Sequence, residues 1–254
     1  MIIAYYRPQT IEEALKLLSA PNSHPLGGGT VLTRSTDESI TAVDLQALSL
    51  DRLSTSGNNL SIGATVTLQT LLESSYIPSS LKTALKLEAP LNHRCIGTVA
   101  GALVACDGRS PFATAMLAMD ARLTLEGDQS TVYGLGDILH LRYDILNNKL
   151  ITKIEISVQC NLAFETVARS PADKPIVSAA LAQWTSGRTR LVIGGWGKAP
   201  TLAFDGNENS GIESAARNSA QDSTDEWASA EYRSNVSAVL AKRCLDKISL
   251  DKKE

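Results

Sequence analysis

The chain has 254 residues, of which 43% are hydrophobic and 20% are charged, a composition typical of a globular protein. Its formal net charge is −3, without the basic excess of nucleic-acid-binding proteins, so we expect no nucleic-acid partner. No apolar run reaches the roughly 20 residues of a membrane-spanning helix, and the N-terminus lacks the basic start and apolar stretch of a signal peptide. The sequence therefore predicts a cytoplasmic protein with no membrane span.

The N-terminal third is predicted to alternate helices and strands. A helix is expected at residues 10–18, because Thr10 and Glu13 have the spacing of a capping box and the apolar residues around them share one helical face. Thr67 is suited to cap a later helix. The other elements predicted in this part are strands at 40–45 and 60–64 and helices at 68–72 and 79–88.

The rest of the chain begins with a further helix signal and then turns to strands. Ser110 can cap a helix whose first residue is Pro111, and we interpret the apolar residues that follow at helical spacing as core. Residues 205–226 are polar and are expected to begin as a loop or linker, before a last helix at 228–246. The remaining predicted elements are strands at 122–125, 150–156, 164–168, 176–183 and 189–193. This order indicates an α+β protein and not a doubly wound sheet.

Gly27, Gly28 and Gly29 form the strongest local signal. Glycine is needed where φ is positive or where the backbone approaches a ligand, and successive N–H groups in such a loop can bind a phosphate. A branched side chain at Gly28 is therefore expected to weaken ligand binding more than it destabilises the fold. The alternative is a tight loop without a ligand, because the segment has no Walker lysine and no G-x-G-x-x-G spacing.

A second small-residue loop is predicted at residues 97–103. Together the two loops could flank the two sides of one pyrophosphate. The alternative for the second loop is close packing of a helix on a sheet through small residues. The four cysteines are scattered and include no C-x-x-C pair, which argues against a metal centre or an iron–sulfur cluster in the chain itself.

The chain resembles the FAD-binding medium subunits of the molybdenum hydroxylases, the family of xanthine dehydrogenase and carbon-monoxide dehydrogenase. The resemblance runs almost from end to end, and its clearest motifs are the triple-glycine loop, which is similar to A-G-G-T-D-L, and residues 94–101, which are similar to R-N-x-A-T-I-G-G. The other segments that carry it are residues 6–15, 43–45, 60–67, 117–121 and 230–233, with Val239, Leu240 and Arg243.

The resemblance implies an α+β fold in three parts. A two-part FAD-binding domain of the PCMH type is expected at residues 1–170, made of a small α/β piece at about 1–55 and a central mixed-sheet α+β piece at about 56–170. A small α/β C-terminal domain of the carbon-monoxide dehydrogenase flavoprotein type is expected at residues 171–254.

The resemblance also implies a function. The chain would be an electron-transfer subunit with FAD as its cofactor, and it would receive electrons from an iron–sulfur subunit and pass them to NAD or another acceptor. A molybdopterin-containing large subunit would complete the oxidoreductase complex. The residues that the resemblance assigns to cofactor binding are Leu26, Gly27, Gly28, Gly29, Thr30, Val31, Thr98, Val99, Ala100, Gly101 and Asp107, and it assigns no catalytic or metal-binding residue.

The sequence departs from the family pattern in several side chains. Ala100 and Ala102 stand where the second loop normally ends G-G-N or G-G-S, and Thr166 stands where many members have Lys. Pro111 occupies the place of an Asp that lies near the flavin ribityl or ribose, and Asp107, four residues earlier, is the substitute that remains. Backbone contacts to the pyrophosphate are expected to be preserved. The alternative is a degenerate member that keeps the fold as a structural subunit without flavin.

Overall fold

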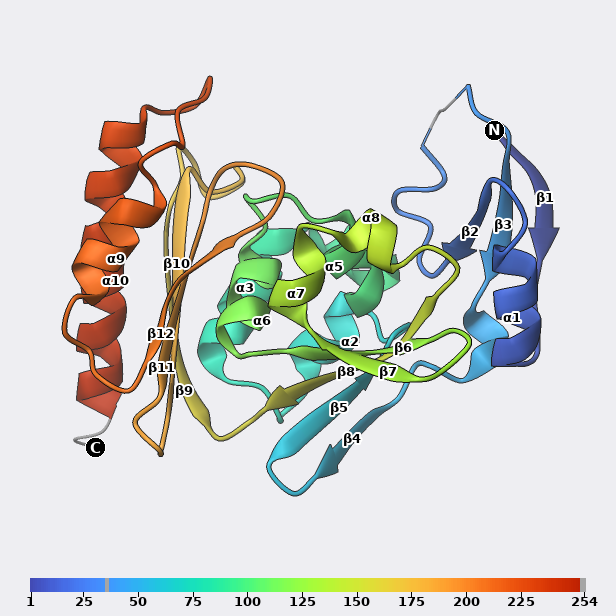
Figure 1. Ribbon diagram of the computed structural model, residues 1–254, viewed down its shortest axis with the longest axis horizontal. Coiled ribbons are helices and arrows are strands. Elements are labelled where there is room, and N and C mark those ends of the chain that lie inside the picture. Colours follow the sequence, from blue (N-terminus) through green and yellow to red (C-terminus); the bar gives the residue numbers. More distant parts are fainter. Residues whose placement is uncertain (35–36, 252–254) are drawn as a thin grey trace. The chain divides into compact units, whose positions relative to one another are not determined.

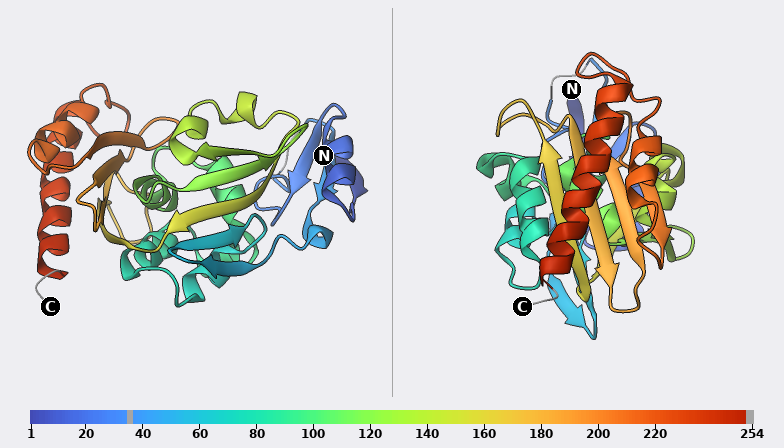
Figure 2. Two further views of the ribbon diagram at one scale, coloured as in Figure 1. Left: turned by 60° about the horizontal axis from the view of Figure 1, so that its bottom comes forward. Right: turned by 90° about the vertical axis from the view of Figure 1, so that its left-hand side faces the viewer.

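The computed structural model describes residues 1–34 and 37–251 (Figures 1 and 2). The chain divides into two compact units, and the segments that form one unit alternate along the sequence with those that form the other. The first unit comprises residues 1–74, 90–105 and 122–155, and the second comprises 75–89, 106–121 and 156 to the C-terminus. Each unit is described by itself.

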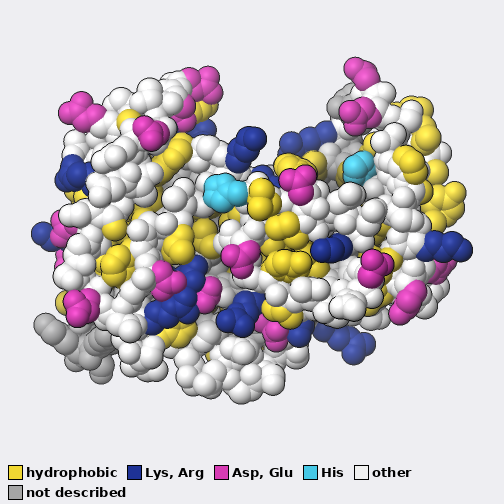
Figure 3. Space-filling model, viewed as in Figure 1, with side chains coloured by type: hydrophobic (Ala, Val, Ile, Leu, Met, Phe, Trp, Pro, Cys, Tyr) yellow, Lys and Arg dark blue, Asp and Glu magenta, His cyan; other side chains and the backbone are white. Residues whose placement is uncertain are grey.

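The first unit begins with a parallel sheet of three strands, in the order β1 (Ile2–Tyr6), β3 (Ile40–Asp44), β2 (Ser23–Leu26). Helix α1 (Ile11–Leu18) connects β1 to β2, and its buried residues pack with Val43, Leu45 and Leu150. The edge strand β1 exposes apolar side chains, which Figure 3 shows as a hydrophobic margin at the N-terminal end of this unit. Because the strands are parallel, their carboxyl ends lie at one edge of the sheet.

The first unit also holds most of a five-stranded sheet, in the order β4 (Leu53–Ser56), β5 (Asn59–Gly63), β8 (Leu150–Ser157), β6 (Arg122–Glu126), β7 (Thr131–Gly134). The pairs β4–β5, β6–β7 and β6–β8 are antiparallel. The short helices of this unit are η1 (Gln46–Leu48), α2 (Leu68–Glu73), α4 (Leu91–Ile96), α5 (Val99–Ala105), α7 (Leu135–Leu139) and α8 (Arg142–Ile145).

The second unit is a three-layer arrangement around an antiparallel sheet, in the order β12 (Thr201–Gly206), β11 (Thr189–Gly194), β10 (Val177–Trp184), β9 (Cys160–Val167). Helices α9 (Ile212–Ser219) and α10 (Ala230–Asp251) cover one face, and α3 (Ser79–Glu88) and α6 (Pro111–Ala118) cover the other (Figure 1). Because both faces are covered, β10 and β11 are buried along nearly their whole length.

Local capping signals in the sequence are confirmed. The hydroxyl of Thr10 accepts a hydrogen bond from the Glu13 N–H at 3.2 Å, and Thr67 caps α2 through the Thr70 N–H at 3.0 Å. Ser110 caps α6 in the same way, with Pro111 as the first helical residue. The α+β fold class is confirmed as well. In each cap the donor and acceptor are three residues apart, so the sequence alone contains both partners.

Two segments expected as loops contain helices in the structure. The loop predicted at residues 97–103 falls largely within α5, which spans residues 99–105. The polar stretch 205–226 contains α9, whose buried Ile212 and Ala216 pack in the core of the second unit. The domain boundary between residues 170 and 171 stays a prediction; it lies between β9 and β10, which pair at eight consecutive positions. Which segments join which unit depends on contacts between residues far apart in the sequence, and no local sequence pattern predicts these contacts.

Candidate functional site

A cleft of about 490 Å³ opens in the first unit, beside the segments that follow β2 and β3. Its volume is within the range of small-molecule and cofactor sites. The residues that line it include Leu18, residues 23–25, 27–32, Leu45, Ala64, Thr65, Thr98, Ala100, Gly101, Val104, Ala105, Arg142, Tyr143 and 146–151. Among these described residues there is no Asp or Glu, so no carboxylate opposes an anionic ligand here.

The segment of residues 27–32 forms one wall of the cleft and offers backbone donors. None of its six N–H groups donates a hydrogen bond to a described residue. The carbonyl groups, in contrast, hold the turn together: Gly29 O accepts from the N–H of Thr33 at 3.2 Å, and Val31 O accepts from the N–H of Arg34 at 3.1 Å. Successive free N–H groups of this kind form an anion-binding concavity, as the sequence predicts.

Three positions of this segment require glycine for different structural reasons. Gly29 has a φ of 71°, which glycine adopts without strain. A Cβ on Gly28 would lie 1.7 Å from the carbonyl oxygen of Ile96, and a Cβ on Gly27 would lie 2.8 Å from Oγ1 of Thr98. Gly28 is not among the glycines with a positive φ. Gly27 and Gly28 are glycines because the first loop packs directly on residues 96–98.

In the second segment, at the start of α5, the backbone N–H groups do donate hydrogen bonds within the chain. The N–H of Val99 donates to Val66 O at 2.8 Å, and that of Ala100 donates to Ala64 O at 3.2 Å. The N–H of Gly101 donates to Oγ1 of Thr98 at 3.2 Å. These N–H groups are thus already hydrogen-bonded within the chain, which does not support the expectation of a second set of phosphate-binding N–H groups.

Most of the residues predicted for this second segment still lie at the cleft. Thr98, Ala100 and Gly101 line it, whereas Val99 is fully buried behind them. The segment therefore contributes a wall of short side chains. Leu26, predicted with the first loop, ends β2 directly before the free N–H groups.

Asp107 belongs to the second unit and is not among the residues that line the cleft. One oxygen of its carboxylate accepts a hydrogen bond from the Lys174 ammonium group at 2.7 Å. The other oxygen accepts a hydrogen bond from the backbone N–H of Arg109 at 2.9 Å, so the carboxylate is bound within its own loop. Its assignment to the cofactor stays a prediction.

Sequence reasoning missed the part of the lining that α8 and the turn after it supply. Arg142 is a buried cation whose guanidinium donates to Leu139 O at 2.8 Å and lies 5.4 Å from the ring centre of Tyr143. Tyr143 is 76% exposed, so its ring is open to a ligand or solvent. Asn148, with a φ of 55°, completes the turn, and the pair Asn147–Asn148 was the one local signal that could have marked it.

Comparison with known families decides the class of this protein. Residues 1–158 match the model of the family described as the FAD binding domain in molybdopterin dehydrogenase. The chain belongs to this family. FAD is accordingly its cofactor, and its class is that of the FAD-binding subunits of molybdenum hydroxylase-type oxidoreductases.

Similarity to known proteins extends over the whole chain. The Escherichia coli K12 protein named "Uncharacterized protein YgfM" is 28% identical over 253 residues, which covers 94% of each chain. Quinoline 2-oxidoreductase from Pseudomonas putida 86 aligns with a TM-score of 0.79 at 20% identity, over 96% of this chain and 95% of that chain. Reconstituted CO dehydrogenase from Oligotropha carboxidovorans aligns with a TM-score of 0.79 at 21% identity, over 96% of each chain. At these identities the structural likeness establishes the fold.

The described residues include no helix long and apolar enough to cross a bilayer.

Proposed function

We propose that this chain is an electron-transfer subunit through which electrons from an iron–sulfur subunit reach NAD or another acceptor by way of FAD. The observation that carries the proposal is the row of six N–H groups at residues 27–32 that no described residue accepts, on the wall of a cleft whose described lining holds no carboxylate. A diphosphate is the part of FAD that such donors recognise. The flavin supplies the redox chemistry, and the chain's task is to bind and orient it.

We assign distinct tasks to the two walls of the cleft. Residues 27–31 bind the diphosphate through backbone N–H groups, and Leu26 positions them because Leu26 O accepts the Leu45 N–H at 3.0 Å. Thr98, Ala100 and Gly101 allow close approach of the cofactor because their side chains are short. In this proposal the departures at Ala100 and Ala102 are tolerated, because the diphosphate is bound by the first loop.

The proposed partners are an iron–sulfur subunit and a molybdopterin-containing large subunit. Burial raises the pKa of the Cys160 thiol to about 11, and burial, with the nearby Glu165 carboxylate, raises the pKa of Cys244 to about 12. A thiol with so high a pKa is a poor source of the thiolate that a cluster requires. Electrons are therefore proposed to come from another chain. A cytoplasmic location stays a prediction.

Absorption spectroscopy and cofactor titration test the proposal most directly. The purified chain should carry or take up one FAD, with a flavin spectrum, and should bind FMN far more weakly because FMN lacks a diphosphate. ADP should compete with FAD, since it shares the diphosphate. A colourless protein that binds neither FAD nor ADP would contradict the proposed function and favour the structural-subunit alternative.

The dependence on partners has its own test. The flavin-loaded chain alone should not oxidise purines, aldehydes or carbon monoxide with an artificial acceptor, although slow reduction of a dye by NADH is compatible with the proposal. Robust turnover of any of the three substrates by the single chain would show that the role assigned here is wrong.

A further inference from the structure

A second, smaller pocket lies in the second unit and shares no lining residue with the candidate FAD site. Its volume is about 160 Å³, and it is lined by Arg109, Arg169, Asp173, Lys174, Ile176 and Trp227. Since a water molecule occupies about 30 Å³ in the liquid, the pocket admits a small ion with water but no nucleotide. Three of the six lining residues are cationic and one is anionic.

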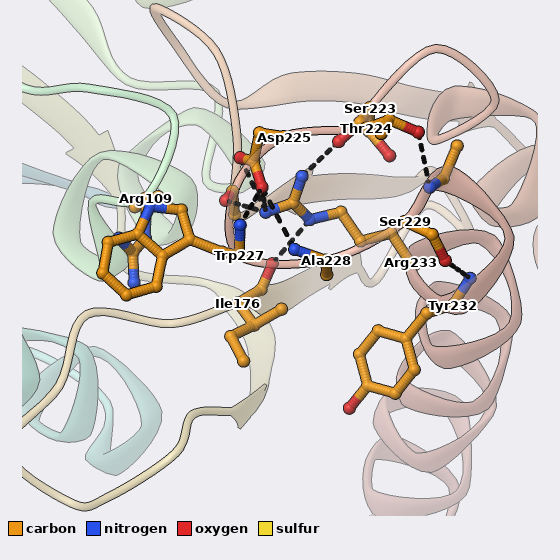
Figure 4. A network of polar contacts seen from close by, with 12 residues as sticks. Arg109, Ile176, Ser223, Thr224, Asp225, Trp227, Ala228, Ser229, Tyr232 and Arg233 are labelled. Atoms are coloured by element: carbon orange, nitrogen blue, oxygen red, sulfur yellow. Dashed lines mark hydrogen bonds and ion pairs between the residues drawn. The ribbon is translucent and has the colours of Figure 1, made fainter.

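Trp227 is the centre of this pocket. The guanidinium carbon of Arg109 lies 4.6 Å from the centre of its ring, and that of Arg169 lies 4.8 Å away. Figure 4 shows Arg109 against the indole. Two positive charges thus lie near each other beside one aromatic ring. They repel each other unless the ring, solvent or an anion compensates for the repulsion.

The position of Trp227 is set by an ion pair between the buried Arg233 and the partly exposed Asp225. Arg233 is fully buried and donates to both oxygens of Asp225 at 2.8 Å (Figure 4). Asp225 in turn accepts from the backbone N–H groups of Trp227 at 2.8 Å and Ala228 at 3.2 Å. Losing Asp225 would leave the buried Arg233 guanidinium without its carboxylate, which is costly, so this contact holds the segment that carries the indole.

Two of the three cations of the pocket are also oriented by fixed contacts. Arg109 donates to the carbonyl oxygens of Pro175 at 2.9 Å and Lys174 at 2.7 Å. The Lys174 ammonium group pairs with Asp107 at 2.7 Å. Arg109 is therefore placed before any ligand binds, and part of the entropy cost of binding is already met by the fold.

Arg169 differs from these two cations. It forms no hydrogen bond and no ion pair with any other described residue, so its planar set of N–H donors is available. The single carboxylate of the pocket, Asp173, accepts from the Ser170 hydroxyl at 3.0 Å. Guanidinium groups bind carboxylates and phosphates through paired, charge-assisted hydrogen bonds.

We propose that this pocket beside Trp227 binds a small oxyanion, a carboxylate or a phosphate group, between Arg109 and Arg169. The ordinary alternative is that the stacked arginines only stabilise the segment around Trp227. The two differ in a measurable way, because a stabilising stack needs no anion, whereas an oxyanion site saturates. The proposal is independent of FAD binding and of the function proposed above.

Nuclear magnetic resonance titration of the full chain tests the proposal. The indole N–H signal of Trp227 is identified by its loss in Trp227→Phe and is followed during titration with inorganic phosphate and, separately, with succinate. Ionic strength is held constant with sodium chloride, because screening alone changes exposed charge interactions. We expect a saturable shift with at least one of the two anions, and the anion that binds more tightly distinguishes a phosphate from a carboxylate ligand.

Two variants that each remove one positive charge show whether anion binding depends on Arg169 itself or only on the net charge. Arg169→Gln should weaken anion binding by about tenfold, because it removes the charge-assisted hydrogen bonds of the available guanidinium group. Arg243→Gln removes the same charge from the exposed surface of α10 in the same unit and should leave binding unchanged. A shift that does not saturate with either anion, or that weakens equally in both variants, overturns the proposal.

Discussion

The two small-residue segments of the first unit look alike in sequence but differ in what their backbones do. Residues 27–32 leave all six N–H groups unused by described residues, whereas Val99, Ala100 and Gly101 each donate within the chain. The first segment can therefore receive an anion without losing an internal hydrogen bond. To bind an anion through the same N–H groups, the second segment would have to lose internal hydrogen bonds. Small residues alone do not make a phosphate site; unused donors do.

The glycines of the first segment show a second difference. Gly28 has no side chain because the backbone of Ile96 and Gly97 occupies the space a Cβ would need, and at Gly27 the Thr98 side chain occupies it. The second segment is therefore a support for the first, and the two form one structural element. Substitutions in each segment should separate support from ligand binding.

Gly28→Val should have the largest effect, and the structure moves that effect from ligand binding, where the sequence alone places it, to stability. The new side chain would overlap the Ile96 carbonyl oxygen, which is backbone and cannot rotate away, so we expect the free energy of unfolding to fall by about 3 kcal/mol. Urea unfolding of the flavin-free chain measures this. The control is Gly57→Asn, at a positive φ of 57° with no neighbouring atom within 4 Å, where asparagine is tolerated. An unchanged unfolding midpoint with lost FAD binding would contradict the packing role.

Thr30→Asp should have the next largest effect, on cofactor binding. A carboxylate placed among the free N–H groups repels the diphosphate, and we expect the dissociation constant for FAD to rise by about thirtyfold, or about 2 kcal/mol. Ala105→Asp puts the same charge on the other side of the cleft and should raise it much less. Isothermal titration calorimetry with FAD measures both. Equal losses in the two variants would indicate a general charge effect and not a diphosphate site at residues 27–32.

Thr98→Val should produce a smaller loss, and in stability. Thr98 is 7% exposed, and its hydroxyl accepts the Gly101 N–H at the start of α5. Removing this acceptor should lower the free energy of unfolding by about 1 kcal/mol. Thr98→Ser retains the hydroxyl and should restore most of the stability. If Thr98→Val instead weakens FAD binding by more than it lowers stability, the hydroxyl contacts the cofactor directly.

The smallest effect is expected at acid pH, from the carboxylate that ends β3. Burial on its own raises the pKa of Asp44, but hydrogen bonds from Tyr5, from the Gln46 N–H and from Arg7 outweigh it and hold that pKa below its usual value. A folded pKa below the unfolded value of about 3.9 means that the stabilisation is present at neutral pH and is lost as pH falls through the folded pKa. Thermal midpoints measured from pH 7 to pH 3 should fall more steeply for the native chain than for Asp44→Asn. Parallel curves would show that Asp44 contributes no such pH dependence.

Short-range features of the fold could be predicted from the sequence. Thr10, Thr67 and Ser110 each cap a helix through an N–H group three residues later, so both partners lie within one turn. The helix of residues 79–88 was predicted with the bounds that it has in the structure. The small-residue signal at residues 27–29 also identified the loop that lines the cleft.

Long-range features could not be predicted in this way. The sequence did not reveal that Arg142 and Tyr143 line the cleft, because they reach it through the fold and belong to no phosphate motif. Nor did it show that Asp107 is paired with Lys174, 67 residues later in the chain.

The sequence by itself determined the family, the α+β class, the helix caps and the position of the first loop, because each depends on residue types at short, fixed spacings. The tertiary structure decided which of the two small-residue segments can bind an anion. That outcome depends on whether another part of the chain, such as Ala64 or Val66, supplies an acceptor to the same N–H group. A backbone hydrogen bond between segments more than 30 residues apart leaves no periodicity or motif in the sequence, and it is visible only once the chain has folded.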